Sequence, residues 1–184
     1  MNLPIRKAAI VLTKDDPEGL KHTIDHILPY FSAIYIGYDL EFPDPKSTNL
    51  KLMHVVFSEH DDKNGFGWKR TYIDKLAKNY QIHVHIDCDE VWDTAVLTDL
   101  VKTVTKEKPC WRSPRCNMPD GHAYPDYQVR VFWYTPAMHW VGDVHELLYD
   151  GDKPADQGKN VGTFKTPIMH LPRNQQLNRK WWKQ

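Results

Sequence analysis

Short apolar runs alternate with amphipathic stretches through the first half of the chain. Four runs have the length and spacing of buried or half-buried strands, at residues 7–13, 33–39, 50–57 and 81–90. Apolar residues recur at helical spacing in three stretches, at residues 20–29, 68–80 and 93–106. The order strand, helix, strand, strand, helix, strand, helix predicts an α/β fold with a mostly parallel sheet flanked by helices.

The pattern changes after Pro109. Aromatic, strand-like pieces broken by Pro and Gly follow, at residues 110–117, 127–134 and 139–149. The basic segment 173–184, which contains Trp181 and Trp182, predicts a terminal helix. We therefore expect one domain over residues 1–184, in which the C-terminal half adds extra strands to a nucleotide-binding first half.

Composition narrows the class of protein. The 184 residues carry 24 Lys and Arg against 24 Asp and Glu, which argues against a globally basic nucleic-acid coat and against a polyacidic tail. The apolar stretch near the N-terminus is too short for a signal peptide, and no run approaches the ~20 apolar residues of a membrane-spanning helix. Three cysteines without a C-x-x-C motif suit reduced thiols. We expect a soluble, cytoplasmic protein without a transmembrane segment.

The sharpest chemical feature is the acidic end of the fourth predicted strand, His85-Ile86-Asp87-Cys88-Asp89-Glu90. In a strand, residues 83, 85, 87 and 89 share one face. Ligands of open parallel sheets collect at the carboxyl ends of the strands, where Asp87 and Asp89 fall. Two carboxylates there need a cation or hydrogen-bond donors, and Mg²⁺ or Mn²⁺ is the natural cation.

The two histidines of this strand have a plainer interpretation. At ~3.3 Å per residue, positions 83 to 89 span about 20 Å, which is too far for all four side chains to share one ion. We therefore expect His83 and His85 to be hydrogen-bonded packing residues beneath a covering helix.

Further motifs follow in a recognisable order. They are Phe66-Gly67-Trp68-Lys69-Arg70, Asp87-Cys88-Asp89-Glu90, Arg115-Cys116-Asn117, Pro125-Asp126-Tyr127-Gln128-Val129-Arg130-Val131-Phe132, Trp140-Val141-Gly142-Asp143-Val144-His145-Glu146 and Pro167-Ile168-Met169-His170. With these motifs, over roughly residues 7–182, the chain resembles the nucleotide-sugar glycosyltransferases of the GT-A fold, particularly the large inverting family two. It departs from them after Asp39, where Leu40-Glu41-Phe42-Pro43 replaces the usual Gly-Ser-Thr-Asp-Gly-type loop.

The resemblance implies a GT-A-like, Rossmann-related fold and a metal-dependent, inverting glycosyltransferase. Residues 1–92 would bind a nucleotide-diphosphate sugar, and residues 93–184 would bind the acceptor. A Mn²⁺ or Mg²⁺ ion would be held by Asp87, Asp89 and His170. The expected donor-binding residues are Thr13, Asp39, Lys69, Arg70, Asp87 and Arg130.

An inverting transferase also needs a general base for the acceptor hydroxyl. Glu146 and Asp143 are the two candidates, and His145 and Trp140 would orient the base or contact the acceptor. The acceptor itself stays open among a glycan, a lipid-linked sugar, a protein and a modified nucleic-acid base. The resemblance places such an enzyme in the cytoplasm of a bacterial or virus-infected cell.

Other interpretations of the same residues remain. A nucleotidyltransferase or phosphohydrolase would use the same carboxylate pair for phosphoryl chemistry. A non-catalytic module could bind sugar or nucleic acid through its Trp and Tyr residues. Arg130 could equally form a structural ion pair, and the tail tryptophans could simply dock a helix onto the core.

Overall fold

The computed structural model describes residues 4–13, 16–39, 49–58, 61, 63–117, 122–143 and 146–171, with the backbone alone at residues 39, 117 and 122–126. The first half contains β1 (Lys7–Leu12), α1 (Pro17–Ile27), η1 (Leu28–Tyr30), β2 (Ala33–Asp39), β3 (Leu52–Phe57), α3 (Gly65–Leu76), β4 (Ile82–Asp87), β5 (Glu90–Val91) and α4 (Thr94–Thr103). The second half contains β6 (Cys110–Asn117), β7 (His122–Trp133), β8 (Met138–Val141), β9 (Leu147–Asp150), β10 (Lys153–Pro154), η2 (Ala155–Gln157), β11 (Val161–Thr163) and β12 (Ile168–His170).

The predicted elements of the first half are all present. The start of α1 follows from its sequence, because the Asp16 side chain accepts a hydrogen bond from the Gly19 amide and Pro17 occupies the first turn. Asp93 caps α4 in the same way, through the amides of Ala95 and Val96. The predicted tail helix at 173–184 lies outside the described residues. No helix within the described ranges is long and apolar enough to cross a membrane.

The main sheet is mixed. Its nine strands run in the order β3-β2-β1-β4-β7-β6-β12-β5, with β11 paired to β6. The strands β3, β2, β1 and β4 are parallel neighbours, whereas β7 is antiparallel to both β4 and β6. Residues 118–121 alone connect β6 to β7, and a parallel pair would need a crossover of about a dozen residues or more. The α/β class is therefore confirmed, but the sheet is mixed: β12 and β11 are also parallel to β6, whereas β7 and β5 pair antiparallel with their neighbours.

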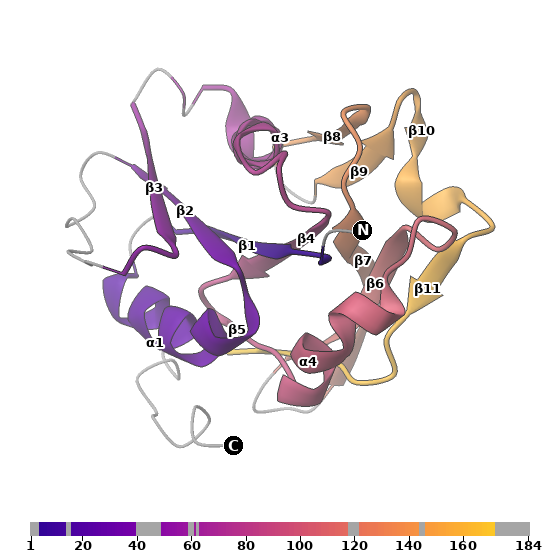
Figure 1. Cartoon of the computed structure of the whole chain (residues 1–184), viewed down its shortest axis with the longest axis horizontal. Coiled ribbons are helices and arrows are strands. Elements are labelled where there is room, and N and C mark those ends of the chain that lie inside the picture. Colours follow the sequence, from indigo (N-terminus) through magenta and orange to yellow (C-terminus); the bar gives the residue numbers. More distant parts are fainter. Residues whose placement is uncertain are drawn as a thin grey trace.

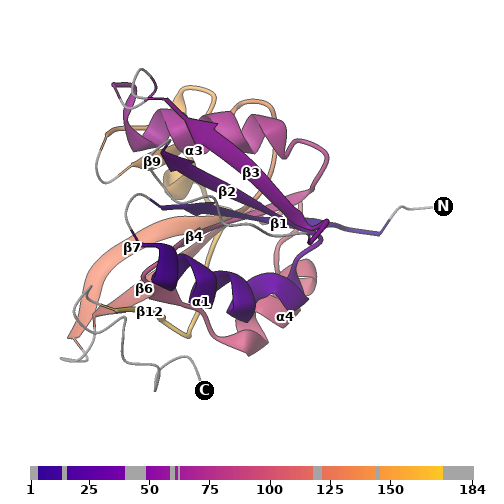
Figure 2. The ribbon, with the colours of Figure 1, turned by 90° about the vertical axis from the view of Figure 1, so that its left-hand side faces the viewer.

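Helices cover both faces of the parallel part (Figures 1 and 2). Figure 2 shows α3 on one face and α1 with α4 on the other. The side chains of each strand divide between these layers. Alternate residues of β4, namely Ile82, Val84 and Ile86, join the core beneath α1 and α4. The intervening residues His83 and His85 therefore face α3, in line with the alternation read from the sequence.

The buried face of α3 differs from its apolar pattern. Ile73 is fully buried, but so are the polar side chains of Lys69, Arg70 and Asp74, at 6%, 4% and 2% exposure. Trp68 and Tyr72, whose spacing identified the helix, are instead 37% and 43% exposed. The helix takes this orientation because it covers the polar face of β4, where buried polar groups need hydrogen-bond partners.

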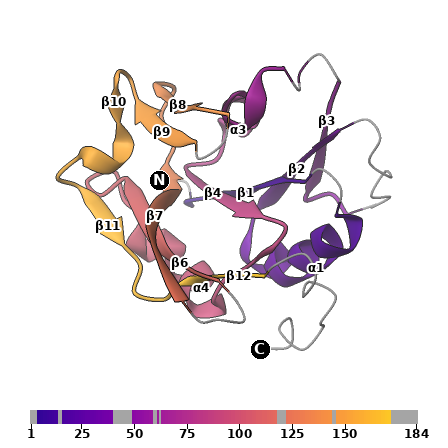
Figure 3. The ribbon, with the colours of Figure 1, turned by 180° about the vertical axis from the view of Figure 1, so that it is seen from behind.

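The small sheet β10-β9-β8 lies beside α3 at its β8 edge (Figure 3). The two elements approach closely at Gly67, whose amide donates to the Gly142 carbonyl oxygen at 3.2 Å. A Cβ at Gly67 would stand 2.5 Å from that oxygen, so only glycine fits there. This contact joins the start of α3 to the segment that follows β8.

Candidate functional site

The candidate site lies at the carboxyl ends of β1 and β4. The chain proceeds outward from β1 to β2 and β3 and then returns to the other side of β1 as β4. Crevices at such switch points are the usual ligand sites of open α/β sheets. The register pairs Leu12 with Asp87, which places Thr13 and Asp87 at the same edge. The first turns of α3, with Lys69 and Arg70, reach this edge as well.

Asp87 is held between two arginines. Arg70 Nη2 donates to its Oδ1 at 2.8 Å, and Arg130 Nη2 donates to its Oδ2 at 2.9 Å. Burial acts to raise the pKa of Asp87, but Arg130 and Arg70 outweigh it and hold this pKa well below its ordinary range. The carboxylate is therefore ionised at neutral pH and fixes both guanidinium groups.

Glu90 extends this network. Arg130 Nη2 also donates to Glu90 Oε1 at 2.9 Å, and the Asp87 amide donates to Glu90 Oε2 at 3.2 Å. Glu90 is 2% exposed, and its burial raises its pKa, although Arg130 opposes the shift. Glu90 was included in the acidic motif of the sequence but was given no role there. The signal for a role was its position three residues after Asp87, which lets its side chain reach back to the Asp87 amide.

A buried relay supports Arg70 from behind. His85 Nδ1 accepts from Arg70 Nη1 at 3.2 Å, so its Nε2 carries the proton and donates to Asp74 Oδ1 at 3.0 Å. Asp74 also accepts from His83 Nδ1 at 2.7 Å and from Trp140 Nε1 at 2.9 Å. Burial lowers the pKa of His85 to about 4, with the Asp74 carboxylate opposing the shift and Arg70 adding to it.

Both histidines therefore have the packing role expected of them. Each is fully buried beneath α3, and each is hydrogen-bonded to Asp74. Asp74 itself was missed from the sequence. Its only signal was a charged residue next to Ile73 within a helical pattern.

Asp89 takes a different partner from Asp87. Its Oδ2 lies 2.8 Å from His170 Nε2, and the two side chains are 30% and 20% exposed. Local pairing creates this contact, because β5 and β12 are antiparallel with His170 opposite Glu90, and the Leu171 amide donates to the Asp89 carbonyl. Two residues far apart in the sequence thus meet at the end of β4.

The predicted three-residue metal set is not assembled in this arrangement. In the part of the chain that the structure describes, no three His, Cys, Asp or Glu side chains gather closely enough to hold an ion. Asp87 faces the arginines, while Asp89 and His170 form a pair. A carboxylate oxygen and an imidazole nitrogen, both partly exposed, are suitable donors for Mn²⁺.

The two candidate bases occupy different places. Glu146 Oε1 lies 3.9 Å from Arg70 Nε, and the Glu146 side chain is 15% exposed. Asp143 follows β8, is exposed and lies against Gly65, the first residue of α3. Gly65 has a φ of +73°, and a Cβ there would overlap the Asp143 carboxylate. Trp140 is buried beneath Arg70, whose guanidinium carbon lies 5.5 Å from its ring centre. His145 lies outside the described residues.

Other predicted donor-binding residues lie at the ends of β1 and β2. Lys69 Nζ is 5.1 Å from the ring centre of Phe57, and Lys69 lines a small hollow together with Thr13. The Thr13 hydroxyl is buried and has no hydrogen bond of standard geometry within the described residues. The side chain of Asp39 is not among the described ones.

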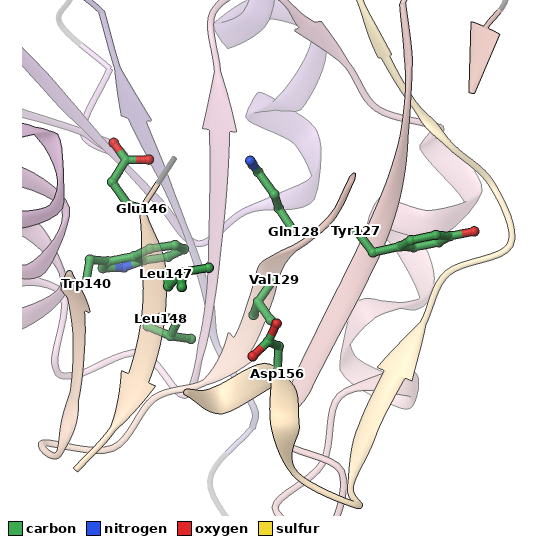
Figure 4. Close-up of a pocket in the computed structure, with 8 residues that line it drawn as sticks. All are labelled: Tyr127, Gln128, Val129, Trp140, Glu146, Leu147, Leu148 and Asp156. Atoms are coloured by element: carbon green, nitrogen blue, oxygen red, sulfur yellow. The ribbon is translucent and has the colours of Figure 1, made fainter. Parts of the chain in front are cut away.

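A larger pocket opens on the other side of Glu146, between β7 and β9 (Figure 4). Its cavity volume is about 100 Å³. Glu146, Trp140 and Leu148 line it from the small sheet, Gln128 and Val129 line it from β7, and Asp156 lines it from η2. The carboxylate of Glu146 therefore borders both the arginine cluster and this pocket.

Known proteins resemble the chain in fold but not in sequence. No protein-family model matches it, and no curated protein matches it. Rv0371C from Mycobacterium tuberculosis H37Rv, solved in complex with manganese, is 10% identical with a TM-score of 0.58, over 96% of this chain and 98% of that chain. A putative glucose-1-phosphate thymidylyltransferase from Bacillus anthracis, in complex with a sucrose, is also 10% identical, with a TM-score of 0.50 over 88% and 87% of the two chains. At this identity the likeness shows a shared fold.

Proposed function

We propose that this protein is a metal-dependent transferase that moves a sugar from a nucleotide-diphosphate donor to a hydroxyl acceptor. The contact between Asp89 and His170 at the carboxyl end of β4 is the main support. It combines two metal-binding groups with an adjacent pair of buried arginines, at the sheet edge where nucleotides bind in related α/β folds.

Asp89 and His170 are the residues that would hold Mn²⁺ or Mg²⁺. Two protein ligands suit such an ion, because it keeps several water or phosphate oxygens in its remaining positions. Once bound, the ion would supply positive charge to the departing diphosphate. The manganese named with Rv0371C, a protein of similar fold, agrees with this assignment.

The arginines provide fixed positive charge beside the diphosphate. Asp87 and the His85–Asp74 relay hold Arg70, and Asp87 with Glu90 holds Arg130, so neither guanidinium needs to be ordered when the donor binds. Such preorganised charge stabilises developing negative charge without a reorganisation cost.

Glu146 is the general base of this proposal. Its carboxylate would take the proton of the acceptor hydroxyl while the hydroxyl oxygen forms a bond to the anomeric carbon of the donor sugar. The bond between that carbon and the diphosphate oxygen breaks, and the nucleotide diphosphate leaves with the bonding electrons. Glu146 suits this role better than Asp143, because it borders both the arginine cluster and the pocket.

Nucleotide release tests the proposal. The protein is incubated with Mn²⁺ and a panel of nucleotide-diphosphate sugars, and free nucleotide diphosphate is measured. We expect release from one donor, and at least about 100-fold less from Asp89→Asn at the same Mn²⁺ concentration, since even indirect partners of a metal contribute 10–100-fold. Asp99→Asn is the matched control, because Asp99 is a 55% exposed partner of Lys102 on α4. Equal release by both variants would refute the assignment.

A nucleotidyltransferase is the second candidate, favoured by the fold shared with the thymidylyltransferase. There a sugar-phosphate oxygen attacks the α-phosphorus of a nucleoside triphosphate, and pyrophosphate leaves. The two reactions are separated by their products: incubation with nucleoside triphosphate and sugar 1-phosphate yields pyrophosphate only in the second case.

A further inference from the structure

The charged residues that line the pocket between β7 and β9 are acidic, in contrast to the neighbouring arginine cluster. Among the described residues that line it, two are acidic, Glu146 and Asp156, and none is a lysine or an arginine. In Figure 4, Glu146 lies toward one end of this set and Asp156 toward the other. The nearby cations Arg70 and Arg130 contact Asp87 and Glu90 outside the lining set, and Arg70 Nε also lies 3.9 Å from Glu146 Oε1.

Three buried apolar side chains line the pocket together with the two carboxylates and the Gln128 amide. Val129, Trp140 and Leu148 line it and are 6%, 7% and 3% exposed. An apolar floor with a few polar groups at the rim is the common design of a small-molecule site. Within the described residues, the Asp156 carboxylate forms no hydrogen bond or ion pair, so both of its oxygens can accept hydrogen bonds from a ligand.

These observations restrict the chemistry of an occupant. Carboxylates accept hydrogen bonds and repel negative charge, particularly beside an apolar floor where screening by water is weak. A sugar phosphate or a nucleic-acid strand would bring an anion between Asp156 and Glu146, and of these two carboxylates only Glu146 has a cation, Arg70, within 4 Å in the described part of the chain. An uncharged sugar would donate its hydroxyl protons to the same oxygens and place its C–H faces on the apolar side chains.

We propose that this pocket binds the acceptor, that the acceptor is an uncharged polyhydroxylated ring, and that Asp156 selects it by accepting hydrogen bonds from its hydroxyls. The proposal rests on the transferase function proposed above and narrows its acceptor to a glycan rather than a nucleic acid or a phosphorylated sugar. Glu146, at the border with the arginine cluster, then receives the proton of the reacting hydroxyl, whereas Asp156 acts only in positioning.

The test uses uncharged methyl glycosides of several hexoses, their 6-phosphates and a single-stranded oligonucleotide. With the donor found active in the release assay, we expect at least one methyl glycoside to raise nucleotide release tenfold or more, and its 6-phosphate and the oligonucleotide to have no such effect. In Asp156→Asn, KM for the glycoside should rise at least fivefold with kcat within twofold. Asp152→Asn, an exposed acidic residue outside the lining set, is the control.

A charge reversal and a binding measurement complete the test. Asp156→Lys should shift preference toward the 6-phosphate by at least tenfold. Saturation-transfer NMR with the methyl glycosides needs no turnover, so a glycoside signal that Asp156→Asn removes would uphold the pocket even if no donor reacted and the transferase proposal failed. The proposal is overturned if a 6-phosphate or the oligonucleotide serves as well as the glycoside, or if Asp156→Asn leaves both KM and the NMR signal unchanged.

Discussion

Replacing Asp74 by Asn tests whether the buried relay holds the site together. The Asp74 carboxylate is 2% exposed and accepts hydrogen bonds from His83, His85 and Trp140. The Asn amide removes the charge and turns an N–H group toward groups that donate. Each buried donor left without its acceptor costs about 1–3 kcal/mol, and three donors lose theirs here. That is a large part of the roughly 5–15 kcal/mol by which domains are stable.

Urea unfolding near neutral pH measures the effect, with the midpoint expected to fall at an unchanged m-value. Asp25→Asn is the matched control, because Asp25 and Lys21 form a surface pair, 2.6 Å apart, with exposures of 61% and 72%. Such pairs contribute about 0–1 kcal/mol. The reasoning about the relay is refuted if Asp74→Asn loses no more free energy of unfolding than Asp25→Asn.

Three further predictions follow from other parts of the fold. Burial lowers the pKa of His85 from 6.5 to about 4, so between these pH values His85 is protonated in the unfolded chain and neutral in the folded one. The free energy of unfolding should therefore fall by roughly 3 kcal/mol as the pH drops from 6.5 toward 4. Unfolding midpoints that stay constant between pH 7 and pH 4.5 would contradict this. Gly67→Ala places a Cβ against the Gly142 carbonyl, so it should lower the free energy of unfolding by about 1–3 kcal/mol and weaken donor turnover. Unaltered stability would show that α3 and the end of β8 separate freely. Because burial raises the pKa of the half-buried Cys88 thiol and of the buried Cys110 thiol to about 12, both should react with a disulfide reagent at pH 8 at least about 100-fold more slowly than in urea; labelling of either at the denatured rate would contradict this.

The sequence predicted those features of the fold that depend on local pattern. The alternation in β4 placed His83, His85 and Asp87 on one face, and Asp16 and Asp93 marked the starts of α1 and α4. These features depend on residues only a few positions apart. They follow from strand and helix periodicity and from capping chemistry.

Features that depend on distant partners were less predictable. The apolar spacing of Trp68 and Tyr72 identified α3 but did not show that Arg70 and Asp74 face the sheet, because that orientation depends on the histidines of β4. Likewise, the acidic motif did not single out Asp87 as the carboxylate that pairs with both arginines. Only the folded arrangement of β7 beside β4 brings Arg130 to it.

The contact between Asp89 and His170 shows both sides of this contrast. Each residue was selected from sequence, one for its strand-end position and the other through the family resemblance. Their meeting depends on the pairing of β5 with β12, across some 80 residues of chain. The contact itself is a side-chain hydrogen bond, and the shared metal ion that the resemblance implied for these two residues stays a prediction.

Anomalous scattering from manganese tests the central claim most directly. Crystals soaked with Mn²⁺ and each nucleotide diphosphate in turn would be measured at the manganese edge. We predict one strong peak within coordination distance of both Asp89 and His170, with the diphosphate of the bound nucleotide beside it. In Asp89→Asn this manganese peak should disappear. A nucleotide bound with its manganese touching neither residue would contradict it.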